Sequence, residues 1–148
     1  MAIKDKTRKP FIEDNNTNIF IGVDLPFRKS DGVEGWFAST STTIEAVKNN
    51  IRNLLQTEQG ERLMQPTLGL SLRKYLFEIM DDEVIFSIQN DIVEVFKRWL
   101  PFVNIQDIQI NMSNDNTSFS KNKLDIKIVF NITQDPNTLD SVQIEIGE

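Results

Sequence analysis

The sequence predicts an α+β fold in which an extended N-terminal arm is followed by three helices and then by a three-stranded antiparallel meander. Three observations support this prediction. Apolar residues recur at helical spacing between residues 44 and 99, they alternate after Pro101, and residues 1–41 follow neither pattern. Because the helices come first and the strands follow, we expect one α+β domain over residues 42–148.

Composition restricts the class of protein. The chain has 148 residues and a formal net charge of −6, and it contains neither cysteine nor histidine. These absences exclude disulfides, thiolate chemistry and every Ser-His or Cys-His catalytic pair. An acidic chain also lacks the basic surface that nonspecific nucleic-acid binding requires, and no apolar run approaches the ~20 residues that cross a bilayer. We therefore expect no nucleic-acid or membrane partner, no cofactor and no metal.

The predicted arm, residues 1–41, consists mainly of polar, turn-forming stretches such as "NNTN" and "KSDGVEG". Its one strand-like piece is Asn18–Phe27, where apolar residues alternate before Pro26. Several aromatic side chains give the arm apolar anchors. We expect it to lie on its own domain or on a neighbouring protein, and the sequence leaves both open.

Three helices are expected over residues 43–59, 69–79 and 83–99. Thr42 followed by Glu45 fits a capping box at the start of the first helix, and Gly60 stands where a left-handed C-terminal cap would end it. The third helix begins with acidic residues, which suit the helix dipole, and Pro101 prevents its continuation.

Three strands are expected over residues 103–113, 123–133 and 141–146. The phase of the alternation changes after Ile105, which indicates a bulge near Gln106 and Asp107. A polar loop should join the first two strands, and "QDPNTLD" should form the turn into the last. In that last strand we expect the apolar residues to face the core and Gln143 to face away from it.

The segment "TEQGERLMQPTLG" joins the first two helices and allows two interpretations. Glu58 and Glu61 lie three residues apart, so they could be a pair of catalytic carboxylates, but no cleft motif frames them. The alternative is that the segment has a structural role, which requires no cleft. Arg62 would pair with Glu61 or with helix-end carbonyls, while Pro66 and Gly69 would shape the loop.

The stretch "TTIEAVKNNIRNLLQTEQGERLMQPTLGLSLRKYLFE", Thr42–Glu78, resembles the sheath-initiator family of contractile-tail baseplates. That family includes the small wedge protein of tailed phages and its type VI secretion counterparts. The resemblance rests on an Ile-rich helix, a Gly-Glu-Arg turn, a Pro-x-x-Gly loop and a Leu-Phe-Glu triplet. The residues that carry these motifs are Gly60, Glu61, Arg62, Pro66, Gly69, Leu76, Phe77 and Glu78.

The resemblance implies a structural protein of the tail baseplate of a virion, assembled in the host cytoplasm. It implies that the C-terminal sheet starts sheath assembly by adding strands of the tail sheath protein. Other baseplate wedge proteins are further implied partners, and tube or hub proteins are candidates. The expected sheath-binding edge is the last strand, with Val142, Gln143, Ile144, Glu145 and Ile146. Alternatively, so small a sheet packs its edges under the helices or the arm.

One motif departs from the family. Many members carry Glu-Pro-Arg after the third helix, where this chain has Leu100-Pro101-Phe102. Together with Trp99, this corner is expected to make an apolar contact with a wedge protein rather than a charged one. The family has also been labelled lysozyme-like, so a peptidoglycan-cleaving enzyme is the competing hypothesis.

Overall fold

The structure is a computed structural model of the chain, and it describes residues 19–25, 27–29, 36–79, 81–113 and 123–147. The chain divides into two compact units, Met1–Asn50 and Ile51–Glu148, which are described separately. This division falls within the first helix, whereas the sequence placed a boundary ahead of it. Residues 1–18 of the predicted arm and most of the predicted polar loop lie outside the described residues.

The first unit contains a short strand pair and the first part of helix α1 (Thr43–Gln56). Strands β1 (Gly22–Val23) and β2 (Ser39–Thr40) pair antiparallel, so the described part of the predicted arm folds back on itself. Asn49 on α1 donates a hydrogen bond to the carbonyl of Val23 at 3.3 Å. This bond ties the strand pair to its own helix.

The start of α1 differs from the predicted capping box. The hydroxyl of Thr42 is buried and has no hydrogen-bond partner among the described residues. The carbonyl of Thr42 instead accepts the N–H of Ala46 at 3.2 Å. Among the described residues, Thr42 therefore bonds the first turn of the helix through its backbone carbonyl and not through its hydroxyl. The prediction of a side-chain cap is wrong.

The end of α1 comes at Gln56, before the predicted end at residue 59. The N–H and the hydroxyl of Thr57 both donate to the carbonyl of Asn53, at 3.1 and 2.6 Å, and close the last turn. Gly60 has a positive φ of 89°, but it lies in the next turn, where the N–H of Glu61 bonds the carbonyl of Glu58. The prediction that Gly60 caps the helix is wrong. The helix ends at Gln56, and the positive φ of Gly60 belongs to the turn that follows.

Residues Thr57–Leu70 form a closed segment, here called the connector loop. The N–H of Leu70 donates to the carbonyl of Thr57 at 2.9 Å, and the N–H of Gly60 donates to the carbonyl of Pro66 at 2.8 Å. Gly69 has a φ of 104°, and a Cβ at this position would lie 2.1 Å from the oxygen of Thr57. Only glycine allows the two ends of the loop to meet so closely.

The second predicted helix, over residues 69–79, is a 3-10 helix, η2 (Leu72–Phe77). The conformation of Gly69 and the bond from Leu70 to Thr57 prevent a helix from beginning earlier. The hydroxyl of Tyr75 donates to Asp91 at 2.8 Å, which fixes η2 to the third helix. The pKa of Lys74 is raised by its hydrogen bond with Tyr75 and by the nearby Asp91, while burial opposes the shift.

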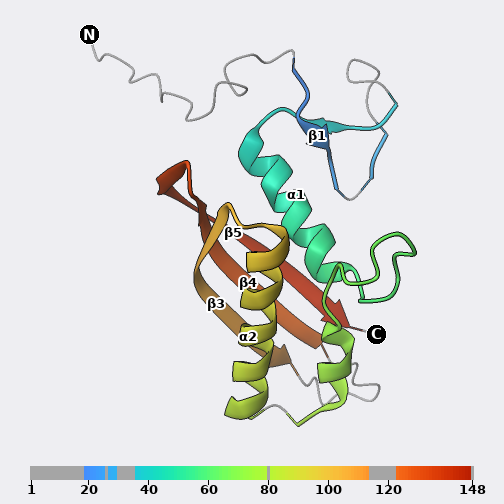
Figure 1. The fold of residues 1–148 in the computed structure, drawn as a ribbon, viewed down its shortest axis with the longest axis vertical. Coiled ribbons are helices and arrows are strands. Elements are labelled where there is room, and N and C mark those ends of the chain that lie inside the picture. Colours follow the sequence, from blue (N-terminus) through green and yellow to red (C-terminus); the bar gives the residue numbers. More distant parts are fainter. Residues whose placement is uncertain (1–18, 26, 30–35, 80, 114–122, 148) are drawn as a thin grey trace. The chain divides into compact units, whose positions relative to one another are not determined.

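The third helix, α2 (Asp82–Trp99), agrees closely with its prediction. The side chain of Asp81 caps it by accepting the N–H of Val84 at 2.9 Å. The helix lies across one face of the sheet (Figure 1). Its buried side chains recur at helical spacing: Ile88, Ile92, Val95 and Phe96.

The sheet of the second unit has the order β3-β4-β5, with both neighbouring pairs antiparallel. The strands are β3 (Val103–Ser113), β4 (Lys123–Ile132) and β5 (Asp135–Gly147). The predicted meander is therefore confirmed. Its buried face includes every second residue of the central strand: Leu124, Ile126, Ile128, Phe130 and Ile132.

The predicted bulge in β3 is also confirmed. Ile105 pairs with Phe130 and Asp107 pairs with the next residue, Val129, so Gln106 is the extra residue. This insertion reverses the phase of the strand and brings Ile108 and Ile110 opposite buried residues of β4. Apolar side chains on both sides of the bulge thus face the same core.

The last strand begins at Asp135, earlier than the predicted Ser141. The register shifts near its start, because Ile132 pairs with Asp135 whereas Phe130 pairs with Asp140. The side chain of Asn131 donates to the carbonyl of Pro136 at 3.0 Å. A proline is tolerated here because β5 is an edge strand. The residues from Asp135 to Asp140, which were predicted to form a turn, therefore belong to an irregular first part of the strand.

We predict that Gly69→Ala destabilises the protein far more than Gly60→Ala. Both glycines have a positive φ, but only Gly69 lacks space for a Cβ. The loss in unfolding free energy should be about 1–2 kcal/mol for Gly60→Ala, from backbone strain. It should reach roughly 3 kcal/mol or more for Gly69→Ala, because the loop must also open. Urea denaturation measures both, and equal losses would contradict the close contact with Thr57.

Candidate partner-binding surfaces

The edge of β5 is the first candidate surface. Within the described ranges, β5 pairs with β4 alone, so its other side carries unpaired backbone groups. Val142 and Ile144 are buried, Ile146 is half-buried, and Gln143 and Glu145 are exposed. The expected orientation of the strand is therefore correct.

One hydrogen bond indicates which amides face the open side. Residues of an antiparallel strand alternate between those that bond the neighbouring strand and those whose N–H and C=O point away. The N–H of Ser141 donates to its neighbour's side chain, Asp140 Oδ1, at 2.7 Å. We infer that Ser141 points away from β4. Gln143 and Glu145 follow at intervals of two and share this direction.

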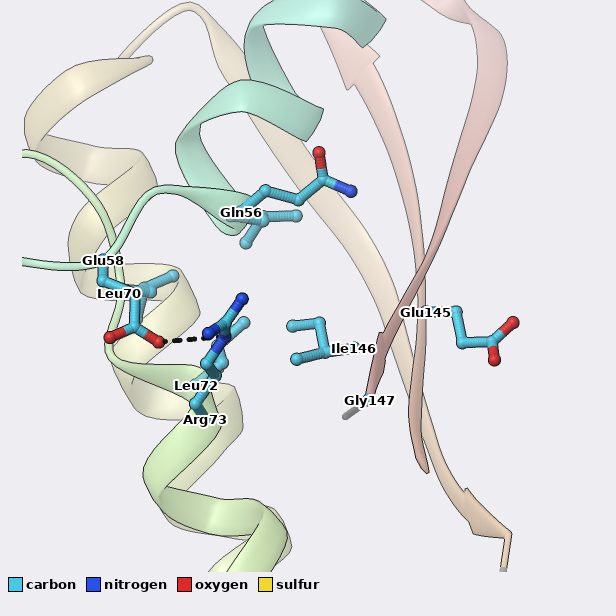
Figure 2. A pocket seen from close by; sticks show the side chains of 9 residues that line it. Gln56, Glu58, Leu70, Leu72, Arg73, Glu145, Ile146 and Gly147 are labelled. Atoms are coloured by element: carbon cyan, nitrogen blue, oxygen red, sulfur yellow. Dashed lines mark ion pairs between the residues drawn. The ribbon is translucent and has the colours of Figure 1, made fainter. Parts of the chain in front are cut away.

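A pocket of about 180 Å³ lies beside the end of this edge. Figure 2 shows that the side chain of Ile146 points toward it, while that of Glu145 points away. Opposite Ile146, Glu58 and Arg73 form an ion pair at 3.4 Å. The remaining lining residues come from α1, the connector loop, η2 and β5: Leu55, Gln56, Leu70, Leu72 and Gly147. The edge thus borders a surface with leucine walls and a charged rim.

The carboxylates of the connector loop have structural contacts. Glu61 Oε2 accepts the N–H of Glu58 at 3.2 Å, which closes the turn containing Gly60. Glu58 lines the pocket and faces Arg73. The two residues therefore do not project together into one cleft as a catalytic pair would.

Arg62 differs from its expected role. It is exposed, and its guanidinium donates to the side-chain oxygen of Asn53 at 2.8 Å. Within the described part of the chain, this guanidinium therefore bonds Asn53 and not Glu61 or a helix-end carbonyl. The expected Arg-Glu pair is replaced by a bond from the loop to the last turns of α1.

The corner after α2 is partly a core element. Leu100 is buried and its carbonyl accepts the N–H of Val103, so it is unavailable to a partner. Trp99 is half-buried. Pro101 is exposed and Phe102 is 40% exposed. The expected apolar contact with a wedge protein remains a prediction for these last two residues.

The structure also exposes apolar side chains that the sequence did not predict as contact residues, although Phe77 belongs to the Leu-Phe-Glu motif. Leu63 and Met64, in the connector loop, are 96% and 94% exposed. Phe77, Ile79 and Phe86 are exposed around the junction of η2 and α2. A detectable signal was present for the first pair, because two large apolar residues stand inside a loop-forming segment.

Two features are absent among the described residues. No cluster of three acidic, histidine or cysteine side chains is arranged to hold a metal ion. Likewise, none of the helices there has the length and apolar character to cross a membrane.

Comparison with known proteins identifies the family. The sequence pattern of the baseplate wedge protein gp25 family matches residues 41–137, well over half of the chain. The chain belongs to this family. It is a baseplate component of contractile-tail systems, and its implied location is a tail structure. The match spans the connector loop and both α-helices but ends before the regular part of β5, so it does not cover Val142–Ile146.

Solved structures show the same fold as this gp25-family chain. A chain of the anti-feeding prophage baseplate is 28% identical, with a TM-score of 0.61, over 75% of this chain and 83% of that one. A Geobacter sulfurreducens protein, provisionally named a tail lysozyme, is 22% identical, with a TM-score of 0.57, over 73% and 93%. The latter similarity shows the fold alone. The search of curated proteins found no match.

We predict that Arg62→Ala costs less than about 1 kcal/mol of unfolding free energy, because the bond to Asn53 is exposed. Asn53→Ala is the matched control, and the double variant should add little to either single loss. Urea denaturation measures all three. A loss above about 2 kcal/mol for Arg62→Ala alone would mean that the loop depends on a contact other than this bond.

Proposed function

We propose that this protein begins sheath assembly on the baseplate of a contractile tail by adding a strand of the tail sheath protein to the open edge of β5. Other wedge proteins, and tube or hub proteins, hold it in the baseplate. In this proposal the particle is a virion assembled in the host cytoplasm. The proposal joins family membership with the free edge of a three-stranded sheet.

The observation that carries the proposal is the state of the β5 edge. Gln143 and Glu145 have exposed side chains, and the bond from Ser141 to Asp140 supports an outward direction for their amides. Such amides and carbonyls can bond an incoming strand without rearrangement of the sheet. The side chains of Val142 and Ile144 remain in the core, so pairing leaves the fold of the monomer intact.

The pocket next to Ile146 adds a second supporting feature. An added strand would place alternate side chains over the buried face of the sheet, where leucines line the pocket. The rim provides both a carboxylate and a guanidinium, from Glu58 and Arg73. Polar as well as apolar groups of the incoming segment therefore find complementary surfaces there.

The decisive experiment is Gln143→Pro. Proline removes the backbone donor that we infer to face the open edge. We expect the purified variant to keep the circular dichroism spectrum and unfolding midpoint of the wild type to within a few degrees. On assembled baseplates it should fail to start sheath polymerisation, seen by electron microscopy and by sheath sedimentation.

The matched control is Gln143→Thr, which changes the same side chain but keeps the N–H, and it should start the sheath normally. Normal sheath formation with a folded Gln143→Pro variant would exclude pairing through this amide. Loss of roughly 3 kcal/mol or more in the isolated Gln143→Pro protein would show that the amide faces β4 instead.

We further propose that the protein is structural and not an enzyme. The carboxylates of the connector loop serve the fold: Glu61 closes a turn and Glu58 faces Arg73. Glycoside hydrolysis needs two carboxyl groups on opposite sides of the scissile bond. The competing proposal, a peptidoglycan-cleaving enzyme, has in its favour the provisional name of one structural neighbour.

Hydrolysis of purified peptidoglycan separates these alternatives. We expect the wild-type protein to release no more soluble fragments than buffer alone, in a turbidity assay and by chromatography of the products. Glu61→Gln, which keeps the size of the side chain, should be indistinguishable from it. Turnover by the wild type that disappears in Glu61→Gln would establish the enzymatic alternative.

A further inference from the structure

The tip of the connector loop carries two large apolar side chains in nearly complete contact with solvent. Leu63 is 96% exposed and Met64 is 94% exposed. They occupy the centre of a turn in which the N–H of Gln65 donates to the carbonyl of Arg62 at 3.2 Å. Single exposed apolar residues are common on proteins, but an adjacent pair at a tip leaves unusually large apolar area in water.

This tip is held in place by contacts on both sides of the turn. The loop closes at its base through Leu70 and Thr57, and the N–H of Gly60 bonds the carbonyl of Pro66. Arg62, directly before the apolar pair, bonds Asn53 on α1. A loop with these internal hydrogen bonds loses little conformational entropy when it binds a partner. Its tip is therefore preorganised for binding.

The fold itself gives the two side chains no role. Leu70 at the base of the loop is buried in the second unit, whereas Leu63 and Met64 contribute nothing to that core. A polar turn would close the loop equally well, because the bonds that shape it are made by backbone groups and by Arg62. The apolar pair is therefore best explained by something that covers it.

We propose that Leu63 and Met64 form a docking tip that inserts into an apolar pocket on another baseplate protein. The partner is a protein because this chain belongs to a family of baseplate wedge proteins, and a baseplate is built from several proteins. A lipid surface fits less well. The charged residues of the connector loop are Glu58, Glu61 and Arg62, so an anionic bilayer would repel the loop rather than attract it.

The chemistry of the partner follows from that of the tip. Leucine and methionine offer no hydrogen-bonding group of consequence, and methionine adapts its shape to irregular surfaces. The receiving pocket must then be apolar, with room for two adjacent side chains. Since Arg62 and Glu61 lie beside the tip, the rim of that pocket is expected to be polar.

This contact is distinct from the proposed sheath contact. The β5 edge binds through backbone groups, whereas the tip binds through side chains of a different segment. The docking tip rests on membership of the baseplate family and not on sheath initiation. A chain that cannot dock would be missing from the baseplate, while a chain with a blocked edge would be present but unable to start a sheath.

The test replaces the apolar pair by serine in the full chain, Leu63→Ser with Met64→Ser. Both positions are exposed, so the unfolding midpoint of the purified double variant should equal that of the wild type. Tail particles are then produced with the variant as the only copy of this chain. Quantitative mass spectrometry of purified baseplates should show a roughly tenfold or greater loss of the chain, because the partner loses two buried apolar contacts.

The matched control is Gln65→Ser with Thr67→Ser, which changes two exposed side chains of the same loop and should be incorporated normally. Normal incorporation of Leu63→Ser/Met64→Ser would overturn the proposal. A photoreactive amino acid at position 63 should crosslink to a single other baseplate protein in assembled particles.

Two other outcomes would also overturn it. A crosslink only to a second copy of this chain would make the tip a self-association contact. Co-sedimentation of the wild type with phosphatidylserine-containing vesicles, lost in the serine variant, would make it a membrane contact.

Discussion

The approach of Gly69 to the carbonyl of Thr57 is the contact on which the second unit depends. Because a Cβ at Gly69 would lie 2.1 Å from that oxygen, the two ends of the connector loop can come together only at a glycine. The same contact delays the start of η2 until Leu72. It also brings Leu70, Leu72 and the ion pair of Arg73 to the pocket beside β5.

The closed loop has consequences at its base and at its tip. At its base, Leu70 is buried in the core and also lines the pocket next to the proposed sheath edge. At its tip, the chain is left with Leu63 and Met64 in solvent. A flexible loop of this length would hide such side chains against the nearest apolar surface, since burial of apolar area is favourable. Closure by backbone hydrogen bonds keeps them exposed.

The acidic residues of this chain repeatedly act as local acceptors of backbone or side-chain hydrogen bonds. Glu61 accepts from the backbone in the connector loop, Asp81 caps α2, and Asp140 accepts from the edge strand. Asp91 receives the hydroxyl of Tyr75 and so attaches η2 to α2. A carboxylate in such a role shapes the backbone and requires no substrate. The excess of acidic residues is therefore compatible with a structural component of a baseplate.

The sequence by itself determined the elements whose pattern is local. The apolar period predicts α2 nearly to the residue, and the strict alternation of residues 124–132 predicts the central strand. Even the bulge at Gln106 follows from a change of phase. Only the tertiary structure decided the rest. Particular hydrogen bonds decided five features: the end of α1, the 3-10 form of η2, the early start of β5, the partner of Arg62 and the exposure of Leu63 and Met64. Hydrogen bonds such as Leu70 to Thr57 and Asn131 to Pro136 set these features, and no periodic pattern of side chains records which backbone groups will meet.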